Sequence, residues 1–254
     1  MNKQIIITCC AIAAGSFSFA QTSRQDSLAK EAAKTEVWTP VPAVVTPGKT
    51  PQDAPSDAVI LFDGTNADQW LTEDGGPAKF LIKNGSMTVV KKSGSPKTKQ
   101  QFTNFQLHLE WKEPTPVKND GQSRGNSGVF LQEFYELQVL DNYDNITYPN
   151  GQCGAIYKQS IPLVNVCRKP GEWQTYDIIW TAPKFNTDGS LLSAARVTVL
   201  QNGVLIQNNF EVQGPTDWIG KNPYKAHGAK SIMLQDHGDD GNPVSFRNIW
   251  VRPL

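Results

Sequence analysis

The sequence predicts an all-β domain, a jelly-roll sandwich of two antiparallel sheets. Short segments rich in β-branched and aromatic residues follow one another from residue 58 to the C-terminus, as in antiparallel sandwiches. Asn84-Gly85, Asn202-Gly203 and the run at 239–242 are typical of turns between such strands. No segment of this region has the 3.6-residue period of a long helix, which argues against an α/β arrangement.

Each predicted strand is a run of apolar or alternating residues bounded by Gly, Pro, Asn or Asp. The strands are expected at residues 58–62, 80–82, 86–90, 105–111, 127–132, 135–140, 155–157, 174–180, 196–201, 204–210, 231–235 and 244–251. Together they predict one domain over residues 57–254, which is long enough to bury a substantial core.

The N-terminus has the pattern of a secretory signal peptide over residues 1–20. Lys3 is followed by an apolar stretch from Ile5 to Phe19 and by a small-x-small cleavage site that ends at Ala20. We therefore expect a secreted protein, periplasmic or extracellular. No later segment has the roughly 18 to 20 apolar residues that span a bilayer.

Residues 21–56 are predicted to be a proline-rich lead-in to the domain. The polar segment 22–35 has a helical composition, whereas the residues after it contain proline at a density that resists both helix and central strand. These prolines are Pro40, Pro42, Pro47, Pro51 and Pro55. The segment is therefore expected to be extended.

The charges are balanced, with 24 basic and 24 acidic residues in the whole chain. Removal of the signal peptide takes away only Lys3 and leaves 23 basic residues against 24 acidic ones. Nearly neutral charge gives no reason to expect nucleic acid or an anionic membrane surface as a partner. No protein partner is evident either.

Cys153 and Cys167 are the two cysteines that follow the signal peptide. In an exported protein we expect them to form one disulfide across a short loop, worth about 3 kcal/mol. A metal pair or a catalytic thiol is the alternative, although no Cys-x-x-Cys motif or nearby His cluster supports zinc.

The segment 135–141 carries the most informative pattern in the chain. Apolar residues at positions 135, 137 and 139 alternate with Glu136 and Gln138, so the two polar side chains share one face of a strand. Asp141 breaks the alternation, which a bulge would correct by turning its carboxylate toward Glu136. Polar groups set into a sheet need a ligand, water or hydrogen-bond partners. This face is a candidate site, with ordinary solvent-facing residues as the alternative.

The run Arg124-Gly125-Asn126-Ser127-Gly128 precedes that strand. Its glycines allow close approach of the backbone, and its polar side chains offer hydrogen bonds to hydroxyl groups or to a carboxylate. A simple turn before a strand is the alternative.

Two tryptophans and one histidine are the remaining candidates for ligand contact. Trp173 and Trp218 lie in predicted loops, where an aromatic ring can lie against a sugar, while most other tryptophans are expected to pack in the core or at its rim. His237 is a candidate for proton transfer, because imidazole gains and loses protons near neutrality. A turn residue is its alternative. We expect His108 to be solvated and His227 to lie on the surface.

A series of motifs runs in order along residues 59–254. They are LFDG at 61–64, GNSGVF at 125–130, YELQVLD at 135–141, GQCGAIY at 151–157, RKPGEWQ at 168–174, LQDHG at 234–238 and FRNIW at 246–250. Together they resemble the secreted 3-keto-disaccharide hydrolase family, also described as 3-keto-glucoside 1,2-lyases and 3-keto-2-hydroxy-glucal hydratases. The resemblance implies a concanavalin A-like jelly roll that acts on sugars already oxidised at C3 by a separate dehydrogenase.

The resemblance also implies a particular chemistry. A ketone at C3 acidifies the hydrogen at C2, so a base can remove it, the glycosidic oxygen at C1 can leave by β-elimination, and water can then add to the enone. The route needs a base, an electrophile for the enolate and an acid at the leaving oxygen. Laminarinase-like glycosidases of this fold carry Glu-x-Asp-x-(x)-Glu on their catalytic strand. Here Gln138 takes the middle position and Asp141 the last, which argues against a retaining two-carboxylate mechanism.

Our sequence hypothesis gives these residues separate roles. Glu136 or His237 transfers protons, and Asp141 is the orienting carboxylate. Arg124 and Gln138 hold the keto and hydroxyl oxygens. The further candidates for substrate binding are Asn126, Trp173, Gln235 and Arg247, with a structural ion pair on the final strand as the alternative for Arg247.

A divalent metal ion is a candidate cofactor, with Glu136, Asp141, Asp236 and His237 as its oxygen and nitrogen ligands. No nucleotide cofactor is expected, because no glycine-rich loop follows a strand and opens a helix. A serine hydrolase is disfavoured because the chain has no Gly-x-Ser-x-Gly elbow. The competing functions are a non-catalytic glycan-binding module and a conventional glycoside hydrolase, each with an oligosaccharide or glycoside as its ligand.

Overall fold

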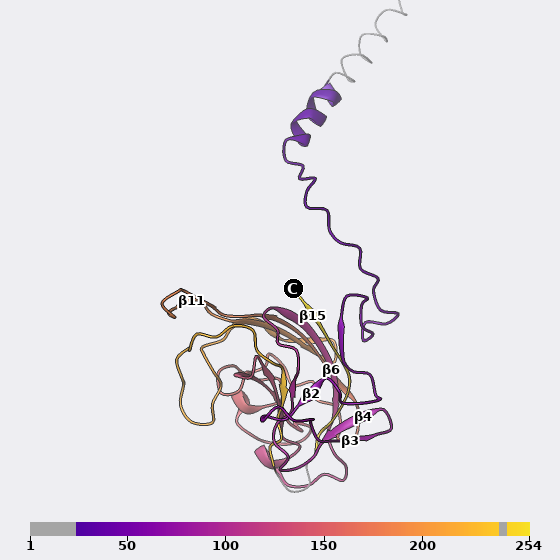
Figure 1. Ribbon diagram of the computed structural model, residues 1–254, viewed down its shortest axis with the longest axis vertical. Helices are drawn as coiled ribbons and strands as arrows, with labels where there is room; N and C mark the ends of the chain where they lie inside the picture. The colour runs from indigo at the N-terminus through magenta and orange to yellow at the C-terminus, as the bar shows by residue number, and fades with distance from the viewer. Residues whose placement is uncertain (1–23, 239–242) are drawn as a thin grey trace, which may run out of the picture. The chain divides into compact units, whose positions relative to one another are not determined.

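The computed structural model describes residues 24–238 and 243–254 (Figure 1). The predicted signal peptide and the turn predicted at 239–242 lie outside the described residues. The chain divides into two compact units, residues 1–44 and residues 45–254. In the first unit, residues 24–33 are helical. Within the described residues, no helix is both long and apolar enough to cross a membrane.

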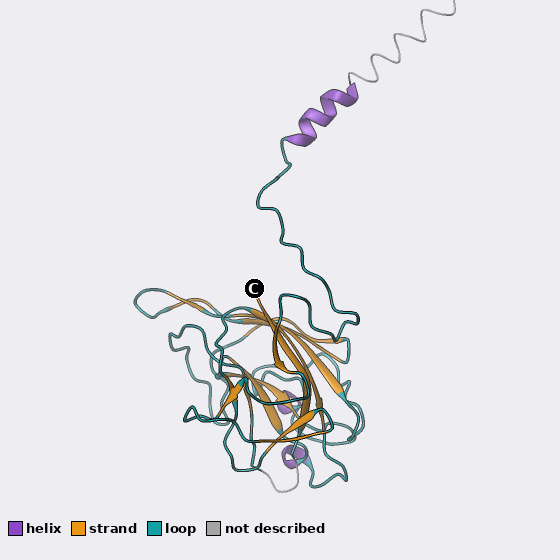
Figure 2. Cartoon of the chain, turned by 45° about the vertical axis from the view of Figure 1, so that its right-hand side comes forward, coloured by secondary structure: helices purple, strands orange, loops and turns teal. Residues whose placement is uncertain are grey.

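The second unit is a sandwich of antiparallel sheets surrounded by long loops (Figure 2). The larger sheet has the order β13 (Val204–Glu211), β12 (Arg196–Gln201), β9 (Gln174–Thr181), β6 (Phe105–Lys112), β15 (Ser245–Pro253), β4 (Ser86–Val89) and β3 (Phe80–Lys83), and β1 (Val59–Phe62) also pairs with β15. The smaller sheet has the order β2 (Trp70–Leu71), β5 (Lys97–Thr98), β14 (Met233–Leu234), β7 (Ser127–Leu131) and β8 (Tyr135–Val139). A separate ribbon pairs β10 (Lys184–Phe185) with β11 (Leu191–Ser193), and two 3-10 turns are η1 (Gly121–Ser123) and η2 (Pro149–Gly151).

The predicted class, an all-β sandwich of two antiparallel sheets, is confirmed. One expected strand differs from the prediction. The segment 155–157 follows the outer edge of β8 but forms only a bridge, between Leu137 and Ile156. Backbone hydrogen bonds from Gln138 N to Ala155 O (2.9 Å) and from Tyr157 N to Glu136 O (3.1 Å) hold it there. This segment therefore protects the edge of β8 and brings Tyr157 next to the strand.

The core lies between the two sheets and follows strict strand alternation. Strand β6 presents alternate apolar residues to it, β9 and β8 do the same, and all of these side chains are at most 1% exposed. They are Phe105, Leu107, Leu109 and Trp111 of β6, Tyr176, Ile178 and Trp180 of β9, and Tyr135, Leu137 and Val139 of β8. Their burial fixes which side of β8 faces away from the core.

The outer face of the larger sheet carries polar residues that are buried in its central part, at His108 and Glu110 of β6. His108 is fully buried, against our expectation that it would be solvated: its Nδ1 lies 2.7 Å from Asp177 Oδ1, and its ring stacks on Trp250. Part of the predicted lead-in covers this face, because Gln52 O accepts hydrogen bonds from Asn248 Nδ2 (3.0 Å) and Trp250 Nε1 (2.9 Å). Residues 45–56 therefore pack with the domain.

The predicted disulfide is not formed in the structure. Cys153 and Cys167 are free thiols, and each sulfur lies 3.5 Å from the same atom, Gln201 Nε2. The buried Cys153 Sγ also lies 2.9 Å from Tyr176 Oη. The fold thus brings the two cysteines together, but they share polar neighbours in place of a covalent bond.

The packing of residues 45–56 generates a prediction about stability. A chain that begins at residue 57 leaves the Trp250 indole without its Gln52 acceptor, leaves the Asn248 amide with Glu110 Oε1 but without Gln52 O, and uncovers part of the outer face. Its free energy of unfolding should be about 2 kcal/mol lower than that of a chain that begins at residue 45. Urea denaturation of the two chains measures the difference, and equal midpoints would show that the segment contributes nothing.

Candidate active site

The outer face of the smaller sheet carries Glu136 and Gln138 of β8, as the alternation predicts. In the register of β7 and β8, Phe130 lies opposite Glu136 and Gly128 lies opposite Gln138. A Cβ atom at Gly128 would overlap Oε1 of Glu136 and displace this carboxyl. The missing side chain lets the Glu136 carboxyl lie down across β7.

A cleft of about 610 Å³ opens over this face. Its floor includes Phe130, Glu136 and Gln138. Its walls come from loops: Gln122 and Ser123 of η1, Tyr148 and Tyr157 on either side of η2, the run Thr216–Trp218, and Asn126, Gln235 and His237. A volume of this size suits a small ligand with one or two rings.

Glu136 is a strongly perturbed carboxyl of the cleft. The residue is 6% exposed, and burial alone raises the pKa of its carboxyl to about 8. Its backbone N donates to Thr216 Oγ1 (2.9 Å), which ties the strand to the loop over the cleft. The carboxyl is therefore mostly protonated at neutral pH.

The Gln138 amide lies beside this carboxyl and can be turned two ways. In one orientation its Nε2 donates to Gln122 Oε1 (3.2 Å) and to Gly151 O (3.3 Å). In the other, Nε2 donates to Glu136 Oε1 and to Ser127 O, both at 3.1 Å. The second orientation gives the Glu136 carboxyl a neutral donor and not a cation.

Aromatic and phenolic groups form one wall of the cleft. The hydroxyl oxygens of Tyr148 and Tyr157 lie 2.8 Å apart. The ammonium group of Lys158 lies over both rings, 5.8 Å from the centroid of Tyr148 and 5.5 Å from that of Tyr157, and it also donates to Trp218 O. Trp218 itself lines the cleft and is 71% exposed.

Another part of the lining holds buried acceptors that lack a partner in the described part of the chain. Asn126 Nδ2 donates to Gln122 O (2.7 Å), but the buried Asn126 Oδ1 and Gln235 Oε1 have no hydrogen-bond partner among the described residues. Ser127 Oγ donates to Gln235 O (2.8 Å) and fixes this wall to β7. Unpaired buried acceptors are costly, so ligand hydroxyl groups are the partners that this wall fits.

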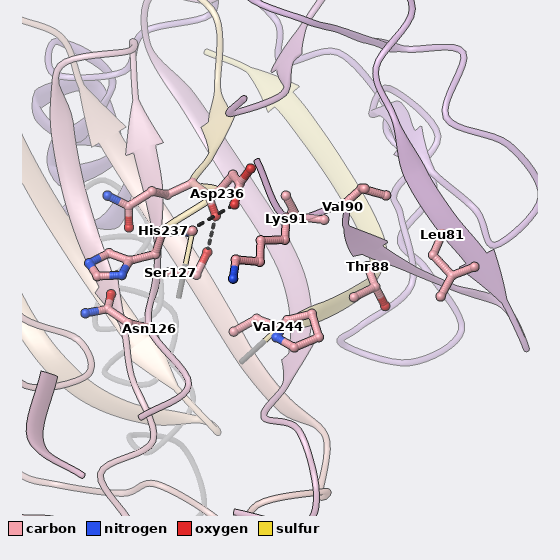
Figure 3. Close-up of a pocket in the computed structure, with 13 residues that line it drawn as sticks. Leu81, Thr88, Val90, Lys91, Asn126, Ser127, Asp236, His237 and Val244 are labelled. Atoms are coloured by element: carbon pink, nitrogen blue, oxygen red, sulfur yellow. Dashed lines mark hydrogen bonds between the residues drawn. The ribbon is translucent and has the colours of Figure 1, made fainter. Parts of the chain in front are cut away.

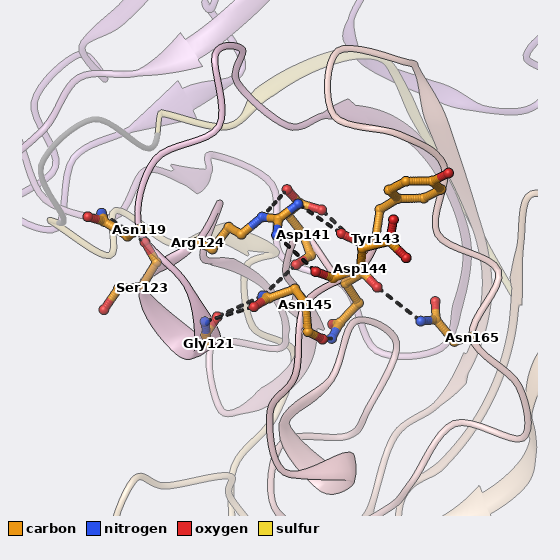
Figure 4. Close-up of polar contacts among 10 residues, drawn as sticks. Asn119, Gly121, Ser123, Arg124, Asp141, Tyr143, Asp144, Asn145 and Asn165 are labelled. Carbon is orange, nitrogen blue, oxygen red and sulfur yellow. Dashed lines mark hydrogen bonds and ion pairs between the residues drawn. The ribbon is translucent and has the colours of Figure 1, made fainter.

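The structure removes Arg124 and Asp141 from the cleft. Arg124 Nε donates to Asp141 Oδ2 (2.6 Å), and its other nitrogens donate to Tyr143 O (2.8 Å) and Asp144 O (3.3 Å) (Figure 4). Asp141 Oδ1 accepts from Tyr143 N (3.1 Å), so the predicted turn of this carboxylate toward Glu136 does not occur. The pair holds the loop after β8 and lines no part of the cleft.

Trp173 and Arg247, also predicted to bind substrate, lie on the larger sheet. The Arg247 guanidinium stacks on the Trp173 ring, with 4.1 Å from Cζ to the centroid, and its Nε donates to Glu110 Oε2 (2.7 Å). Arg247 thus takes the role of a structural ion pair on the final strand. Of the two loop tryptophans, only Trp218 lines the cleft.

The four predicted metal ligands do not form a ligand set. No group of three or more His, Cys, Asp or Glu side chains is placed to hold a metal ion among residues 24–238 and 243–254. Asp141 is paired with Arg124, and the Asp236 carboxylate accepts from Ser93 N (2.9 Å) and Gly238 N (3.1 Å). Of the four predicted ligands, Glu136 and His237 line the cleft, and Asp141 and Asp236 do not. The dependence of this protein on a metal ion stays a prediction.

Sequence reasoning missed Tyr148, Tyr157, Gln122 and Thr216 as cleft residues. They lie in loops, where no periodicity tells which way a side chain points. Tyr157 could have been found from its place in the GQCGAIY motif, whereas the other three carried no signal. His227, expected on the surface, is half-buried, and its Nε2 lies 2.8 Å from Tyr135 Oη.

The jelly roll with a polar, aromatic-walled cleft on the smaller sheet is of the kind found in carbohydrate-acting proteins. The chain belongs to the family of 3-keto-alpha-glucoside-1,2-lyase-like domains, whose model matches residues 57–252. The resemblance that we found in the motifs is therefore confirmed.

Solved structures agree with this assignment. The chain is similar to a candidate glycosyl hydrolase from Parabacteroides distasonis, with 54% identity, a TM-score of 0.84, and coverage of 87% of this chain and 96% of that one. Two further candidate glycosyl hydrolases from the same organism, at 20% and 23% identity, have TM-scores of 0.56 and 0.54. They cover 78% of this chain and 94% and 99% of their own, and they show the fold alone. No protein with a curated description matches the chain significantly.

The raised pKa of Glu136 predicts how stability depends on pH. The folded protein keeps a proton on this carboxyl that the unfolded chain gives up above pH 4.5, so between pH 4.5 and about 8 stability falls as the pH rises, by about 1.4 kcal/mol per pH unit at most. Glu136→Gln, which carries no charge, should lack this loss. Urea denaturation at pH 5 and pH 8 measures it. Glu172→Gln, at an exposed carboxyl, is the control, and parallel pH profiles of wild type and Glu136→Gln would refute the shift.

A second prediction concerns Arg124. Its guanidinium compensates the negative charge of Asp141. Asp141 lies near the buried carboxyl of Glu113, and the pKa of Glu113 is raised first by burial and then by the charge of Asp141. Arg124→Ala should therefore cost about 3 to 5 kcal/mol of folding free energy. Thermal or urea unfolding measures the loss, and a variant as stable as the wild type would show that the ion pair is dispensable.

Proposed function

We propose that the protein is an enzyme that cleaves 3-keto-glycosides by C2 proton abstraction and β-elimination at C1, followed by hydration of the enone. The observation that supports it most is Glu136, a carboxyl with a pKa raised to about 8 inside a polar cleft, in a chain of the 3-keto-alpha-glucoside-1,2-lyase-like family. A carboxyl that holds its proton at neutral pH suits an acid at a leaving oxygen.

The reaction balances with two proton-transfer groups. A base takes the C2 proton and the electron pair forms an enolate across C2, C3 and the keto oxygen. The enolate collapses to a C1–C2 double bond as the C1–O bond breaks, and the leaving oxygen takes a proton from the acid. In the second half, water adds at C1, its proton goes to the ionised acid, and the base returns a proton to C2.

The residues of the cleft divide these roles between them. Glu136 is the acid that protonates the leaving oxygen and then receives the proton of the attacking water. His237, which also lines the cleft, is the base, because an imidazole nitrogen can accept a proton. No carboxylate nucleophile is needed, which agrees with the presence of Gln138 where a conventional retaining enzyme would have its carboxylate.

The tyrosine pair, and not Arg124, supplies the electrophile. When one phenol donates to the other over 2.8 Å, the acceptor phenol keeps its own O–H for a further acceptor. That O–H is the donor for the keto oxygen as negative charge develops on it, and the ammonium group of Lys158 lies over both phenol rings.

A conventional glycoside hydrolase is less well supported. The other carboxylate in the described lining of the cleft is Asp217, and it accepts hydrogen bonds from Trp218 N (2.8 Å) and Asn222 Nδ2 (2.7 Å). A glycan-binding module would use the aromatic rim alone. It would give no role to a neutral carboxyl buried beneath that rim.

An activity assay separates these functions. Wild type should release the aglycone from a 3-keto-glucoside but not from the unoxidised glucoside, with a transient enone absorbance. Glu136→Gln should lower kcat at least 100-fold and Tyr157→Phe about 10-fold to 100-fold, while Glu172→Gln keeps wild-type rates. Thermal unfolding confirms that the variants fold, and a chelator arm tests metal dependence.

The opposite results have definite meanings. Hydrolysis of the unoxidised glucoside at a comparable rate would make the protein a conventional glycoside hydrolase. Sugar binding without turnover of either substrate would make it a binding module.

A further inference from the structure

A second cavity, of about 390 Å³, adjoins the cleft (Figure 3). Asn126, Gln235 and His237 line both cavities, so these three residues form a shared wall. The cavity lies where β3 and β4 of the larger sheet approach the start of β7 and the end of β14 in the smaller sheet. In Figure 3, Asn126 and His237 stand at one end of it and Leu81 at the other.

The lining of this second cavity is mostly apolar, unlike that of the cleft. Leu81, Val89, Val90 and Val244 face it together with the aliphatic part of Lys91. Leu81 is 60% exposed and Val90 is 40% exposed, although both are large apolar side chains. Apolar residues gathered in the open around a concave surface are typical of a ligand site.

The polar groups of the second cavity are largely committed to the protein. The Asp236 carboxylate accepts from two backbone N–H groups, of Ser93 and Gly238, and Ser127 Oγ donates to Gln235 O. A second sugar in this space would bury several hydroxyl groups against valine and leucine side chains, which costs free energy for each unpaired hydroxyl. An apolar group meets no such cost.

We propose that this cavity binds the leaving group of the glycoside, and that the leaving group is an apolar, ring-containing aglycone and not a second sugar. The inference rests on the proposed function, because it places the sugar ring in the cleft over Glu136. The shared wall fits the junction between the two parts of such a substrate. Its unpaired acceptors, Asn126 Oδ1 and Gln235 Oε1, take hydroxyl protons of the sugar, and the space beyond takes the aglycone.

The test compares two substrates that differ only in the leaving group. Wild-type protein is assayed with the 3-keto-glucosides of methanol and of 2-naphthol. We expect the KM of the naphthyl substrate to be at least tenfold lower. In the double variant Leu81→Ser/Val90→Ser, whose substitutions lie at partly exposed positions, the KM ratio should fall to about threefold or less. Val117→Ser, at a 45% exposed valine that does not line either cavity, is the matched control and should keep the wild-type ratio.

The outcomes distinguish this inference from the proposed function. Turnover of both keto substrates with equal KM, or a ratio that the double variant retains, would overturn the aglycone site and leave the proposed function standing. If neither keto substrate is turned over, the proposed function fails. Titration calorimetry with the unoxidised naphthyl and methyl glucosides then tests the cavity. A Kd at least tenfold lower for the naphthyl glucoside in wild type, with a ratio of about threefold or less in the double variant, would support it, and any other result would overturn it.

Discussion

The burial of β8 on both of its faces is the constraint on which the candidate site depends. One face belongs to the core through Tyr135, Leu137 and Val139, and the other carries Glu136 and Gln138 beneath loops. A strand covered on both sides must satisfy every polar group that it presents. Gly128 leaves room for the Glu136 carboxyl, and the carboxyl meets the cost of burial by keeping its proton. The chemistry that we propose follows from this packing.

The Arg124 guanidinium is kept away from Glu136. Arg124 is committed to Asp141 and to two backbone carbonyls of the loop after β8. A guanidinium beside Glu136 would favour the ionised carboxylate and lower its pKa, whereas desolvation alone raises it. The loop scaffold and the acidity of the cleft are thus linked, because the ion pair that orders the loop also keeps the Arg124 guanidinium away from Glu136.

The two sheets have different tasks. The outer face of the larger sheet carries charged and aromatic residues that satisfy one another, as in the contacts of His108 with Asp177 and of Arg247 with Glu110. The segment 45–56 adds the carbonyl of Gln52 to that network. The smaller sheet instead leaves acceptors unpaired beside its cleft. Asn126 Oδ1 and Gln235 Oε1 lie where a ligand can satisfy them, whereas Trp111 Nε1 and Gln174 Nε2 of the larger sheet stay buried away from the cleft, without a partner among the described residues.

The sequence by itself determined the all-β sandwich, the family, and the strand that carries Glu136 and Gln138, because alternation with period 2 fixes which side chains share a face once the apolar ones are buried. It also pointed to Asn126, Gln235, His237 and Trp218. The tertiary structure decided the rest. Asp141 and Arg124 meet each other and not Glu136, and Tyr148 and Tyr157 come together from either side of η2. Loop conformations have no sequence period, and a long side chain selects its partner by distances that only the folded chain defines.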